Sequence, residues 1–340
     1  MKVALIFGGM SSEHEVSCLS AASILDNIKG HEVFPLGITK NGEWFYTKAS
    51  SEDIRSGKWT ELEKIPVAID LENKKFVCGG KPLDIDVCFP IVHGRNGEDG
   101  RLQGLLEMLG IKYAGSGVLG SAVCMDKITA NKLFESAGIR RAKWFPVIKG
   151  ENDSIRYVKN EAAKLGYPIF VKPSNAGSSV GITKCFNEAE LEKALETAFA
   201  NDARAVVEKS IEDPLEIEVA VMGNEAPVAS QTGRIISSND QIYDYDAKYL
   251  SGTSQTLVPS GLSAELENEV RKIALKAYLY CGCRGFARVD FLISRDGEIN
   301  INEINTLPGF TSISMFPALF IAGGMTYSEL IDKLLNYALN

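Results

Sequence analysis

The first forty residues follow two hydrophobic patterns that predict a strand, a helix and a second strand. Residues 3–7 form a short β-rich apolar run that ends at two glycines. Over residues 16–24, apolar and small side chains recur at intervals of three and four, the period of a helix with one buried face. Ser12 and Glu15 have the spacing of a capping box at the start of this helix, and residues 32–38 are expected to form the next strand. This order predicts an α/β domain with a parallel sheet.

The rest of the chain mixes helices with short strands and two hairpin signals. Gly-Asn at 223–224 and Asp-Gly at 296–297 each follow a strand-like run, which predicts tight turns between antiparallel strands. Residues 243–260 are polar, aromatic and glycine-containing, and long enough for a functional loop. Residues 40–84 give little information. The other expected elements are strands at 87–92, 167–173, 180–185 and 205–208, and helices at 102–109, 121–136 and 262–280.

Composition and charge narrow the class of protein. A length of 340 residues allows two or three domains, and 36 Lys and Arg against 44 Asp and Glu give a net charge of −8 without a basic block. General nucleic-acid binding is therefore not expected. The longest nearly apolar stretch, residues 315–325, is too short to span a bilayer, and the first residues do not have the form of a signal peptide. We therefore expect a cytoplasmic protein without a membrane partner.

Cysteine and histidine usage argues against two further kinds of site. The seven cysteines contain no Cys-x-x-Cys pair, and the chain has only three histidines. This pattern supports neither a disulfide framework nor a zinc site. The cysteines are expected to be reduced thiols in the core.

The strongest chemical signal lies in the second predicted hairpin. Because side chains alternate between the two faces of a strand, Arg288 and Asp290 share one face of its first strand. The same counting places Glu303 and Asn305 of the second strand on the face of Ile301, which is expected to be buried. A carboxylate removed from water must be paired or bind a metal ion.

The spacing of the acidic residues in this hairpin leaves two interpretations open. Oxygen donors without a neighbouring His or Cys suit Mg²⁺ or Mn²⁺, which a few carboxylates hold together with phosphate oxygens. The alternative is a buried ion network in which Arg288 pairs with the acids. The sequence NTLPG over residues 305–309 adds a rigid loop at the strand end, as active sites often have.

A second candidate site follows a strand that ends at Lys172. The small residues over 174–181 would let backbone N–H groups approach a phosphate, with the lysine as counter-charge. The Walker A pattern is absent, and an ordinary hairpin loop with an exposed lysine is the alternative. Glu208 and Lys209 could contact the adenine and ribose of a nucleotide, although such a pair is more often a surface ion pair.

Other motifs are weaker. Gly115, Gly117 and Gly120 fit the dinucleotide-binding pattern, but the acid that follows, Glu135, falls on a helix rather than at the end of a strand, so we disfavour a nicotinamide site. Glu13 lies at the carboxyl end of the first strand, where α/β sheets bind ligands, yet helix capping explains it as well. A Gly-x-Ser-x-Gly motif is missing, and nothing supports covalent catalysis.

Several motifs taken together resemble the D-alanine–D-alanine ligase family. The sequence HGRNGEDGRLQG is similar to its first signature, and GFARVD with EINTLPG to its second. Further similar segments follow in family order over the whole chain, at residues 8–17, 125–127, 177–181 and 243–249. The resemblance implies α/β and α+β parts, namely an ATP-grasp fold preceded by a Rossmann-like domain. The implied parts are an N-terminal Rossmann-like domain (1–114), a central ATP-grasp subdomain (115–207) and a C-terminal ATP-grasp subdomain with the metal site and active-site loop (208–340).

The resemblance also implies a reaction. In this family ATP phosphorylates the carboxylate of one D-alanine, and the amine of a second attacks the acyl phosphate through a tetrahedral intermediate, for peptidoglycan precursor synthesis. The implied cofactors are ATP and two Mg²⁺ ions (or Mn²⁺), and the implied partners are two D-alanine molecules and a second copy of the chain in a homodimer.

The resemblance assigns two groups of residues to ATP and its metal ions. The metal ligands are the three oxygen donors of the second hairpin, Asp290, Glu303 and Asn305. The nucleotide-binding residues are Lys127, Lys172, Glu208, Lys209, Ile211, Glu216, Lys248 and Asn302.

A third group is implied around the substrates. Glu13 would hold the ammonium group of the first D-alanine, with Ser178 and Tyr249 linked to it by hydrogen bonds. Arg288 and the backbone of Gly309 would stabilise the oxyanion. The remaining substrate contacts are His93, Glu98 and Ser314. The implied catalytic residues are Glu13, Ser178, Tyr249, Arg288 and Ser314.

Departures from the family pattern leave alternatives open. Ile242 and Ser210 stand where some relatives carry larger residues, so nucleotide affinity could differ. Lys248 and Tyr249 favour an amide over an ester product, but a D-serine second substrate is weakly discriminated by a small pocket. The alternatives are a D-alanine–D-serine ligase, another ATP-grasp amide ligase, or a nucleotide-binding protein without catalysis.

Overall fold

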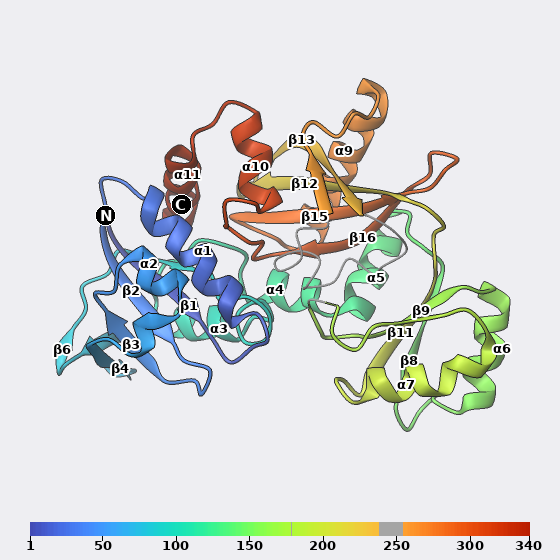
Figure 1. Ribbon diagram of the computed structural model, residues 1–340, viewed down its shortest axis with the longest axis horizontal. Coiled ribbons are helices and arrows are strands. Elements are labelled where there is room, and N and C mark those ends of the chain that lie inside the picture. Colours follow the sequence, from blue (N-terminus) through green and yellow to red (C-terminus); the bar gives the residue numbers. More distant parts are fainter. Residues whose placement is uncertain (178, 238–253) are drawn as a thin grey trace.

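The computed structural model describes residues 1–177, 179–237 and 254–340, which form three β-sheets with helices around them (Figure 1). The strand orders are β6-β5-β4-β3-β2-β1-β7, β10-β9-β11-β8 and β14-β13-β12-β15-β16. The predicted combination of an α/β part with α+β parts is confirmed. None of the described helices is long and apolar enough to cross a membrane.

The first sheet begins with the predicted strand, helix and strand. Parallel pairs join β1 to β2 and to β7, whereas the strands beyond β2 are antiparallel, so the sheet is mixed rather than wholly parallel. Its elements are β1 (Lys2–Gly8), α1 (His14–Asn27), β2 (Glu32–Ile38), β3 (Trp44–Thr47), α2 (Ser51–Arg55), η1 (Lys58–Thr60), β4 (Lys64–Asp70), β5 (Lys75–Cys78), β6 (Lys81–Pro82), β7 (Val87–Pro90) and α3 (Arg101–Met108).

The capping box predicted from Ser12 and Glu15 is wrong. The N-cap residue of α1 is Glu13, and no side chain caps the helix. Instead, the hydroxyl of Ser11 accepts the N–H of Glu13 at 3.2 Å and donates to the carbonyl of His93 at 2.8 Å. The start of α1 is therefore fixed to the loop after β7 rather than closed on itself.

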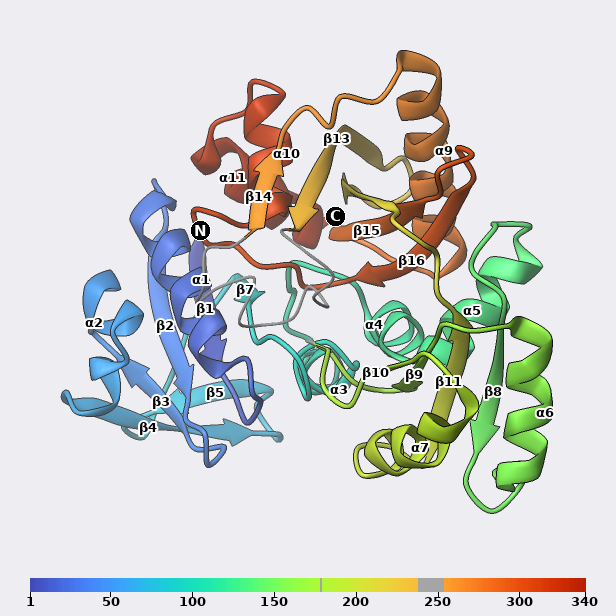
Figure 2. The same cartoon turned by 45° about the vertical axis from the view of Figure 1, so that its right-hand side comes forward.

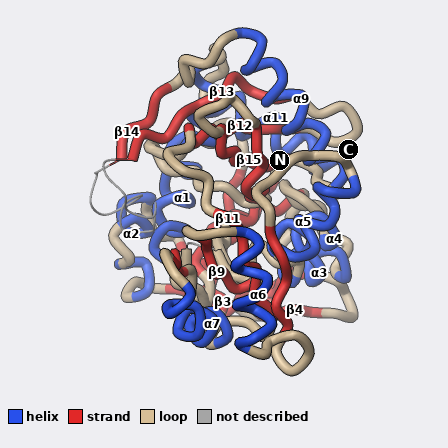
Figure 3. The backbone as a smooth tube through the Cα atoms, turned by 90° about the vertical axis from the view of Figure 1, so that its right-hand side faces the viewer, coloured by secondary structure: helices blue, strands red, loops and turns tan. Residues whose placement is uncertain are grey.

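The second sheet is antiparallel and carries its helices on one face. Ile169 and Val171 point into a core with α6 and α7, so that Phe170 and Lys172, between them, point to the other face. Helix α6 contacts β8 and β11, and α7 contacts β9, β10 and β11 (Figures 2 and 3). The elements are β8 (Trp144–Ile148), α6 (Ile155–Leu165), β9 (Ile169–Pro173), β10 (Thr183–Cys185), η2 (Glu188–Glu190), α7 (Leu191–Phe199) and β11 (Arg204–Lys209).

The third sheet contains both predicted hairpins, and each is confirmed. Strand β12 pairs antiparallel with β13, and β15 pairs antiparallel with β16. One face packs against α4, α5 and α9. The elements are α4 (Val118–Met125), α5 (Lys127–Ser136), β12 (Leu215–Met222), β13 (Val228–Ser237), β14 (Ser254–Leu257), α9 (Ala264–Tyr280), β15 (Phe286–Ile293), β16 (Ile299–Asn305), α10 (Met315–Ala322) and α11 (Tyr327–Leu339).

The helix predicted over residues 121–136 is broken at Asp126. This residue has an extended backbone, with φ −88° and ψ 102°, and its carboxylate accepts the N–H of Thr129 at the start of α5. Asp126 also accepts a hydrogen bond from Ser174 at 3.0 Å and pairs with Arg204. The break therefore fixes the junction between α4 and α5 to the second sheet.

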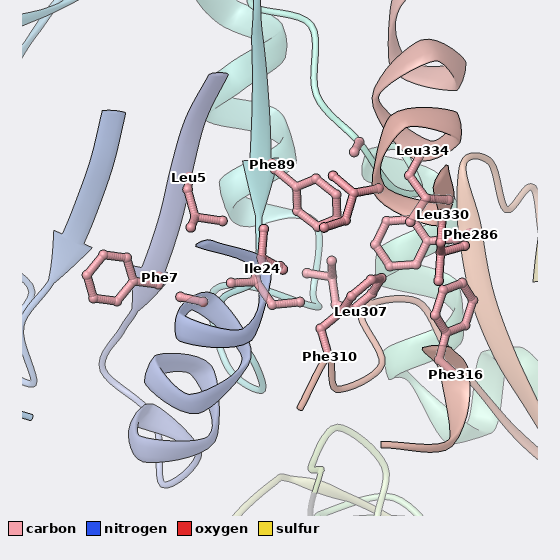
Figure 4. Packing of buried hydrophobic residues seen from close by; sticks show 14 of the residues in the cluster. Leu5, Phe7, Ile24, Phe89, Phe286, Leu307, Phe310, Phe316, Leu330 and Leu334 are labelled. Atoms are coloured by element: carbon pink, nitrogen blue, oxygen red, sulfur yellow. The ribbon is translucent and has the colours of Figure 1, made fainter. Parts of the chain in front are cut away.

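Aromatic side chains join the first sheet to the third (Figure 4). Phe310, which follows β16, contacts Phe89 of β7 and Phe286 of β15, each with ring centroids 5.6 Å apart. It also contacts Phe316 of α10 at 5.3 Å. Because this cluster is fully buried, the loop between β16 and α10 is held between two sheets.

Two further predictions concern domains and thiols. The boundary predicted between 207 and 208 falls within β11, and α4 and α5 share a core with the third sheet, while the division into three parts stays a prediction. All seven cysteines are free thiols and six are buried; the exception is Cys78, which is half-buried.

The glycines at 115–120 have a packing role. A Cβ on Gly120 of α4 would lie 2.6 Å from the carbonyl oxygen of Gly282, and a Cβ on Gly285 would lie 2.7 Å from the backbone nitrogen of Gly115. Close contact between two backbone segments therefore explains the glycines at 115 and 120 without a dinucleotide.

This contact gives a stability prediction. Gly120→Ala is expected to lower the free energy of unfolding by about 1–3 kcal/mol, because the methyl group meets backbone that cannot move aside. The control is Gly104→Ala in α3, where the nearest atom to a Cβ is 3.9 Å away and alanine should stabilise by about 0.5–1 kcal/mol. Urea unfolding of both variants measures the difference. Equal stability of the two would contradict the packing explanation.

Candidate active site

A cleft of about 1040 Å³, counted out to its open mouth, lies where parts of all three sheets meet. Its wall combines the start of α1, the loop after β7, the junction of α4 and α5, the ends of β15 and β16, and the loop before α10. The structure brings together here nine of the predicted site residues, namely Glu13, His93, Glu98, Lys127, Arg288, Glu303, Asn305, Gly309 and Ser314.

Glycines make room for the carboxylate of Glu13. A Cβ on Gly94 would lie 2.5 Å from its Oε2, and a Cβ on Gly177 would lie 3.4 Å from the same atom. Gly94 also has a φ of +71°, which L side chains rarely adopt. The carboxylate therefore lies between the loop after β7 and the small-residue loop after β9.

His93 is buried and hydrogen-bonded on both ring nitrogens. Its Nδ1 is 2.9 Å from the carbonyl oxygen of Leu307 and 3.6 Å from a carboxylate oxygen of Glu98. Its Nε2 is 3.0 Å from Oγ of Ser20 in α1. Sequence reasoning assigned no role to Ser20, because a serine in the apolar period of a helix is not distinguished from a small core residue. His93 thus connects α1 to the loop after β16.

A β-bulge arranges the acidic residues and corrects the predicted strand face. Asp290 pairs with Glu303, but the next residue of β15, Phe291, pairs with Ile301. Asn302 is therefore the extra residue, and it reverses the alternation between Ile301 and Glu303. The prediction that these two share a buried face is wrong. The side chain of Glu303 is 40% exposed, so its burial does not require a cation.

Arg288 is held by two carboxylates on neighbouring strands. Its Nε and Nη2 each donate to Asp290 at 2.7 Å, and its Nε lies 3.1 Å from Oε2 of Glu218. The ion network weighed as an alternative is therefore present. Glu218 was missed by sequence reasoning, although its parity with Glu216 on β12 could have indicated it. The two acids fix the guanidinium at the wall of the cleft.

Lys127 is placed by the break between α4 and α5. Its backbone N–H donates to the carbonyl of Ser174 at 2.8 Å, and its Nζ donates to the carbonyl of Ala176 at 2.8 Å. The same Nζ is 3.6 Å from Oε2 of Glu303. A single ammonium group therefore lies between the small-residue loop and the acidic hairpin.

Glu208 is buried in the second sheet between two cations. It pairs with Lys172, and its Oε2 accepts from Nη2 of Arg141 at 2.9 Å. Burial alone would raise the pKa of Glu208, but the charges of Lys172 and Arg141 outweigh it and hold the pKa below the ordinary value of 4.5. The surface-pair alternative is therefore wrong for Glu208. Arg141 was not predicted, since no motif contains it.

The remaining predicted nucleotide residues do not line this cleft. Nζ of Lys209 donates to the carbonyl oxygens of Tyr167 at 2.9 Å and Gly166 at 3.3 Å, so it supports the turn before β9. The others outside the wall are Ile211 after β11, Glu216 on β12 and Asn302 at the bulge. Ser178, Lys248, Tyr249 and Ile242 lie outside the described residues.

Fold and site together define a class of protein. Two α+β parts follow an α/β domain, and Lys127 lies beside the acidic strand pair near their junction. This is the architecture of an ATP-grasp enzyme. Family models described as D-ala D-ala ligase N-terminus and D-ala D-ala ligase C-terminus match residues 2–116 and 133–336. The chain belongs to the D-alanine–D-alanine ligase family.

Individual relatives agree over the whole length. The chain is 46% identical to the D-alanine–D-alanine ligase of Thermoanaerobacter sp. strain X514, covering 99% of this chain and 96% of that protein. It is 45% identical to the enzyme of that name from Clostridium acetobutylicum, over 99% and 97%. Similar solved structures are the VanG D-Ala:D-Ser ligase of Enterococcus faecalis (TM-score 0.91, 38% identity, 99% of both chains) and the D-alanine–D-alanine ligase of Coxiella burnetii (0.87, 32%, 100% and 95%).

The cations around Glu208 give a pH prediction. Because the pKa of Glu208 is lowered by folding, its ionised form stabilises the fold above about pH 4.5, and this contribution is lost as the pH falls through the lower folded pKa. Arg141→Leu is expected to raise the pKa of Glu208 in the folded protein and to lower the free energy of unfolding by about 2 kcal/mol at pH 7. The stabilising contribution of ionised Glu208 should then be lost at a higher pH than in the wild type.

Urea unfolding between pH 3 and pH 7 tests this. The control is Lys159→Leu, which breaks an exposed pair with Glu188 at 3.2 Å and should cost less than about 1 kcal/mol. If the stability of Arg141→Leu depended on pH in the same way as that of Lys159→Leu, the effect of Arg141 on the pKa of Glu208 would be contradicted.

Proposed function

We propose that this chain joins two D-alanine molecules in an ATP-dependent reaction that releases ADP and phosphate and supplies a peptidoglycan precursor. The observation that carries the proposal is the position of Arg288, which faces a cleft lined by Glu13 and lies on the same hairpin as the acidic pair. A cation at that point can stabilise negative charge that develops on a carboxyl group next to a phosphate. Relatives of that name at 45–46% identity support the same reaction.

The oxygen donors of the acidic hairpin fit a divalent cation that is also coordinated by phosphate oxygens. Asp290 and Glu303 are register partners, and Asn305, two residues after Glu303 in regular pairing, shares its face. Within the described part of the chain no cluster of three or more His, Cys, Asp or Glu could hold a metal ion by itself, so phosphate oxygens would complete the ligand set. Asp290 keeps lone pairs beyond those that accept from Arg288. Mg²⁺ or Mn²⁺ bound there would neutralise phosphate charge.

Cations of the chain would bind the nucleotide. Lys127 lies between the small-residue loop and Glu303, where it can pair with a phosphate oxygen. Lys172 points away from the helices of the second sheet and is fixed by Glu208. The lysines are thus on the two sides of the junction between the second and third sheets. Lys248 and Asn302 keep their proposed role as nucleotide contacts.

Around the two amino-acid substrates, the chain would provide both negatively and positively charged groups. Glu13 would bind the ammonium group of the first D-alanine, and His93 with Glu98 would support this subsite. Arg288 and the N–H of Gly309 would stabilise the tetrahedral oxyanion after the second amine attacks. Ser314, the N-cap of α10, would bind a substrate carboxylate, because helix N-termini favour anions. Ser178 and Tyr249 are proposed to complete the hydrogen bonding at Glu13.

A D-alanine–D-serine ligase is the second candidate, because the VanG protein, whose structure is similar, is a D-Ala:D-Ser ligase. We favour D-alanine as second substrate because the curated relatives at higher identity carry the D-alanine name. The homodimer, the cytoplasmic location and a count of two metal ions are further parts of the proposal.

Substrate choice is tested by release of ADP and phosphate with D-alanine, D-serine, D-lactate and L-alanine in turn. D-alanine alone is expected to support turnover to a dipeptide, while L-alanine should not. Faster turnover with D-alanine plus D-serine than with D-alanine alone would favour the second candidate. Absence of D-alanine-dependent release would refute the proposed function.

Metal binding is tested with Glu303→Gln. The variant should fold, because this side chain is 40% exposed, but turnover should fall at least about 100-fold and titration should show weaker Mn²⁺ binding in the presence of ADP. Glu298→Gln is the matched control, since Glu298 is an exposed carboxylate before the same strand, paired with Arg140. Wild-type turnover in Glu303→Gln would overturn the metal assignment.

A further inference from the structure

Ser20 is a buried residue of α1 that contacts two distant segments of the cleft wall. Its side chain is completely buried. Its Oγ is 3.0 Å from Nε2 of His93 and accepts the N–H of Phe310 at 3.1 Å. One hydroxyl group therefore joins the first helix, the loop after β7 and the loop after β16.

The hydrogen bonds determine which atom donates. The carbonyl oxygen of Leu307 can only accept, so Nδ1 of His93, 2.9 Å away, carries the ring proton. In a neutral ring Nε2 is then the acceptor, and it receives the hydroxyl proton of Ser20. The oxygen of Ser20 accepts from Phe310 at the same time. In this arrangement each of the three hydrogen bonds has one donor and one acceptor, and the ring donates through Nδ1.

These contacts enclose the turn that carries Gly309. Leu307 is held through His93, and Phe310 is held by Ser20 directly, so both ends of the turn are fixed to α1. Glu13 is the N-cap of the same helix, seven residues and therefore about 10 Å along its axis from Ser20. Helix α1 thereby sets the distance between Glu13 and the backbone of Gly309.

We propose that Ser20 is a positioning residue for the ligase reaction, which fixes the ring of His93 and holds the turn 307–310 so that Gly309 faces the reacting carboxyl group. The proposal rests on the proposed function. Ser20 is not among the described residues that line the cleft, and it hydrogen-bonds to His93 and Phe310, so its loss should affect the chemical step more than the binding of D-alanine.

Ser17 supplies a matched control on the same helix. It is also completely buried, and its Oγ accepts the N–H of Gly8 at 2.8 Å and donates to the carbonyl of Ile91 at 2.6 Å. Both partners lie outside the turn 307–310. Ser17→Ala and Ser20→Ala each remove one buried hydroxyl, and both should lower the melting temperature by about 2–4 °C.

The kinetic test measures phosphate release by wild type, Ser17→Ala and Ser20→Ala with saturating ATP and varied D-alanine. Ser20→Ala is expected to lower kcat about 10- to 100-fold with KM within about 3-fold of wild type. Ser17→Ala should keep kcat within about 2-fold. Equal losses of kcat in the two variants, or an unchanged kcat in Ser20→Ala, would indicate a structural role only and would overturn the proposal.

A second measurement needs neither activity nor a folded Ser20 variant. The chain has three histidines, so the imidazole ¹⁵N signals of His93 can be assigned by their loss in His93→Gln. The neutral Nδ1–H form at pH 7.5 supports the proposal, and an Nε2–H or doubly protonated ring overturns it. A wild type without D-alanine-dependent turnover would refute the proposed function; an active wild type with an unaffected Ser20→Ala would refute this inference alone.

Discussion

The candidate active-site cleft depends on one irregularity in the third sheet, the β-bulge at Asn302. With regular pairing, Glu303 would share the face of Ile301 and would be directed into the core. The bulge shifts the register so that Glu303 pairs with Asp290, while Ile301 and Ile304 remain buried. The same two strands therefore bury an apolar face against α9 and present oxygen donors to the cleft. Because the core fixes the strands, the donors need no loop to hold them in position.

The first sheet contributes to the site through its contacts with the loop after β16. Phe310 is packed against rings from β7, β15 and α10, and its N–H is bonded to Ser20. His93 binds the carbonyl of Leu307 in the same loop. A loop held by buried rings and by hydrogen bonds at both ends has little freedom, so backbone groups of the turn are organised before substrate arrives. Segments that are 290 residues apart in sequence are thus joined beside the cleft.

Sequence patterns were sufficient to predict helices and strands where the hydrophobic periodicity and the turn residues agree. The opening strand and helix, both hairpins and the long helix before β15 follow from alternation, helical spacing and Asn or Gly turns. The bulge was not predictable, because strand parity assumes one residue opposite one residue and Asn302 carries no distinctive side chain. The break at Asp126 was missed for a similar reason, since its cause is a partner, Ser174, 48 residues away.

The residues of the candidate site likewise divide into those that local motifs predict and those that depend on distant contacts. Residues within long motifs, such as Glu13, His93 and Arg288, were found because the motifs mark them, and the fold brings them to one cleft. Ser20, Arg141 and Glu218 were not assigned, because each acts on another residue and only the fold brings the two together. The nucleotide role of Lys209 stays a prediction, and its side chain supports a turn through two carbonyl oxygens. A motif identifies a position in the chain, whereas the direction of its side chain depends on tertiary contacts.

Charges at and near the cleft are arranged in pairs that can exchange partners. Arg288 is hydrogen-bonded to Asp290 and forms an ion pair with Glu218, Lys127 is near Glu303, and Lys172 is paired with Glu208. An isolated buried charge would cost several kcal/mol, so pairing lowers the cost of burying each group. When a phosphate or carboxylate enters, the cation already has its charge and geometry, and only the partner changes. The charged groups of the site are therefore oriented during folding. Groups oriented in advance can stabilise a charged transition state without having to reorient during the reaction.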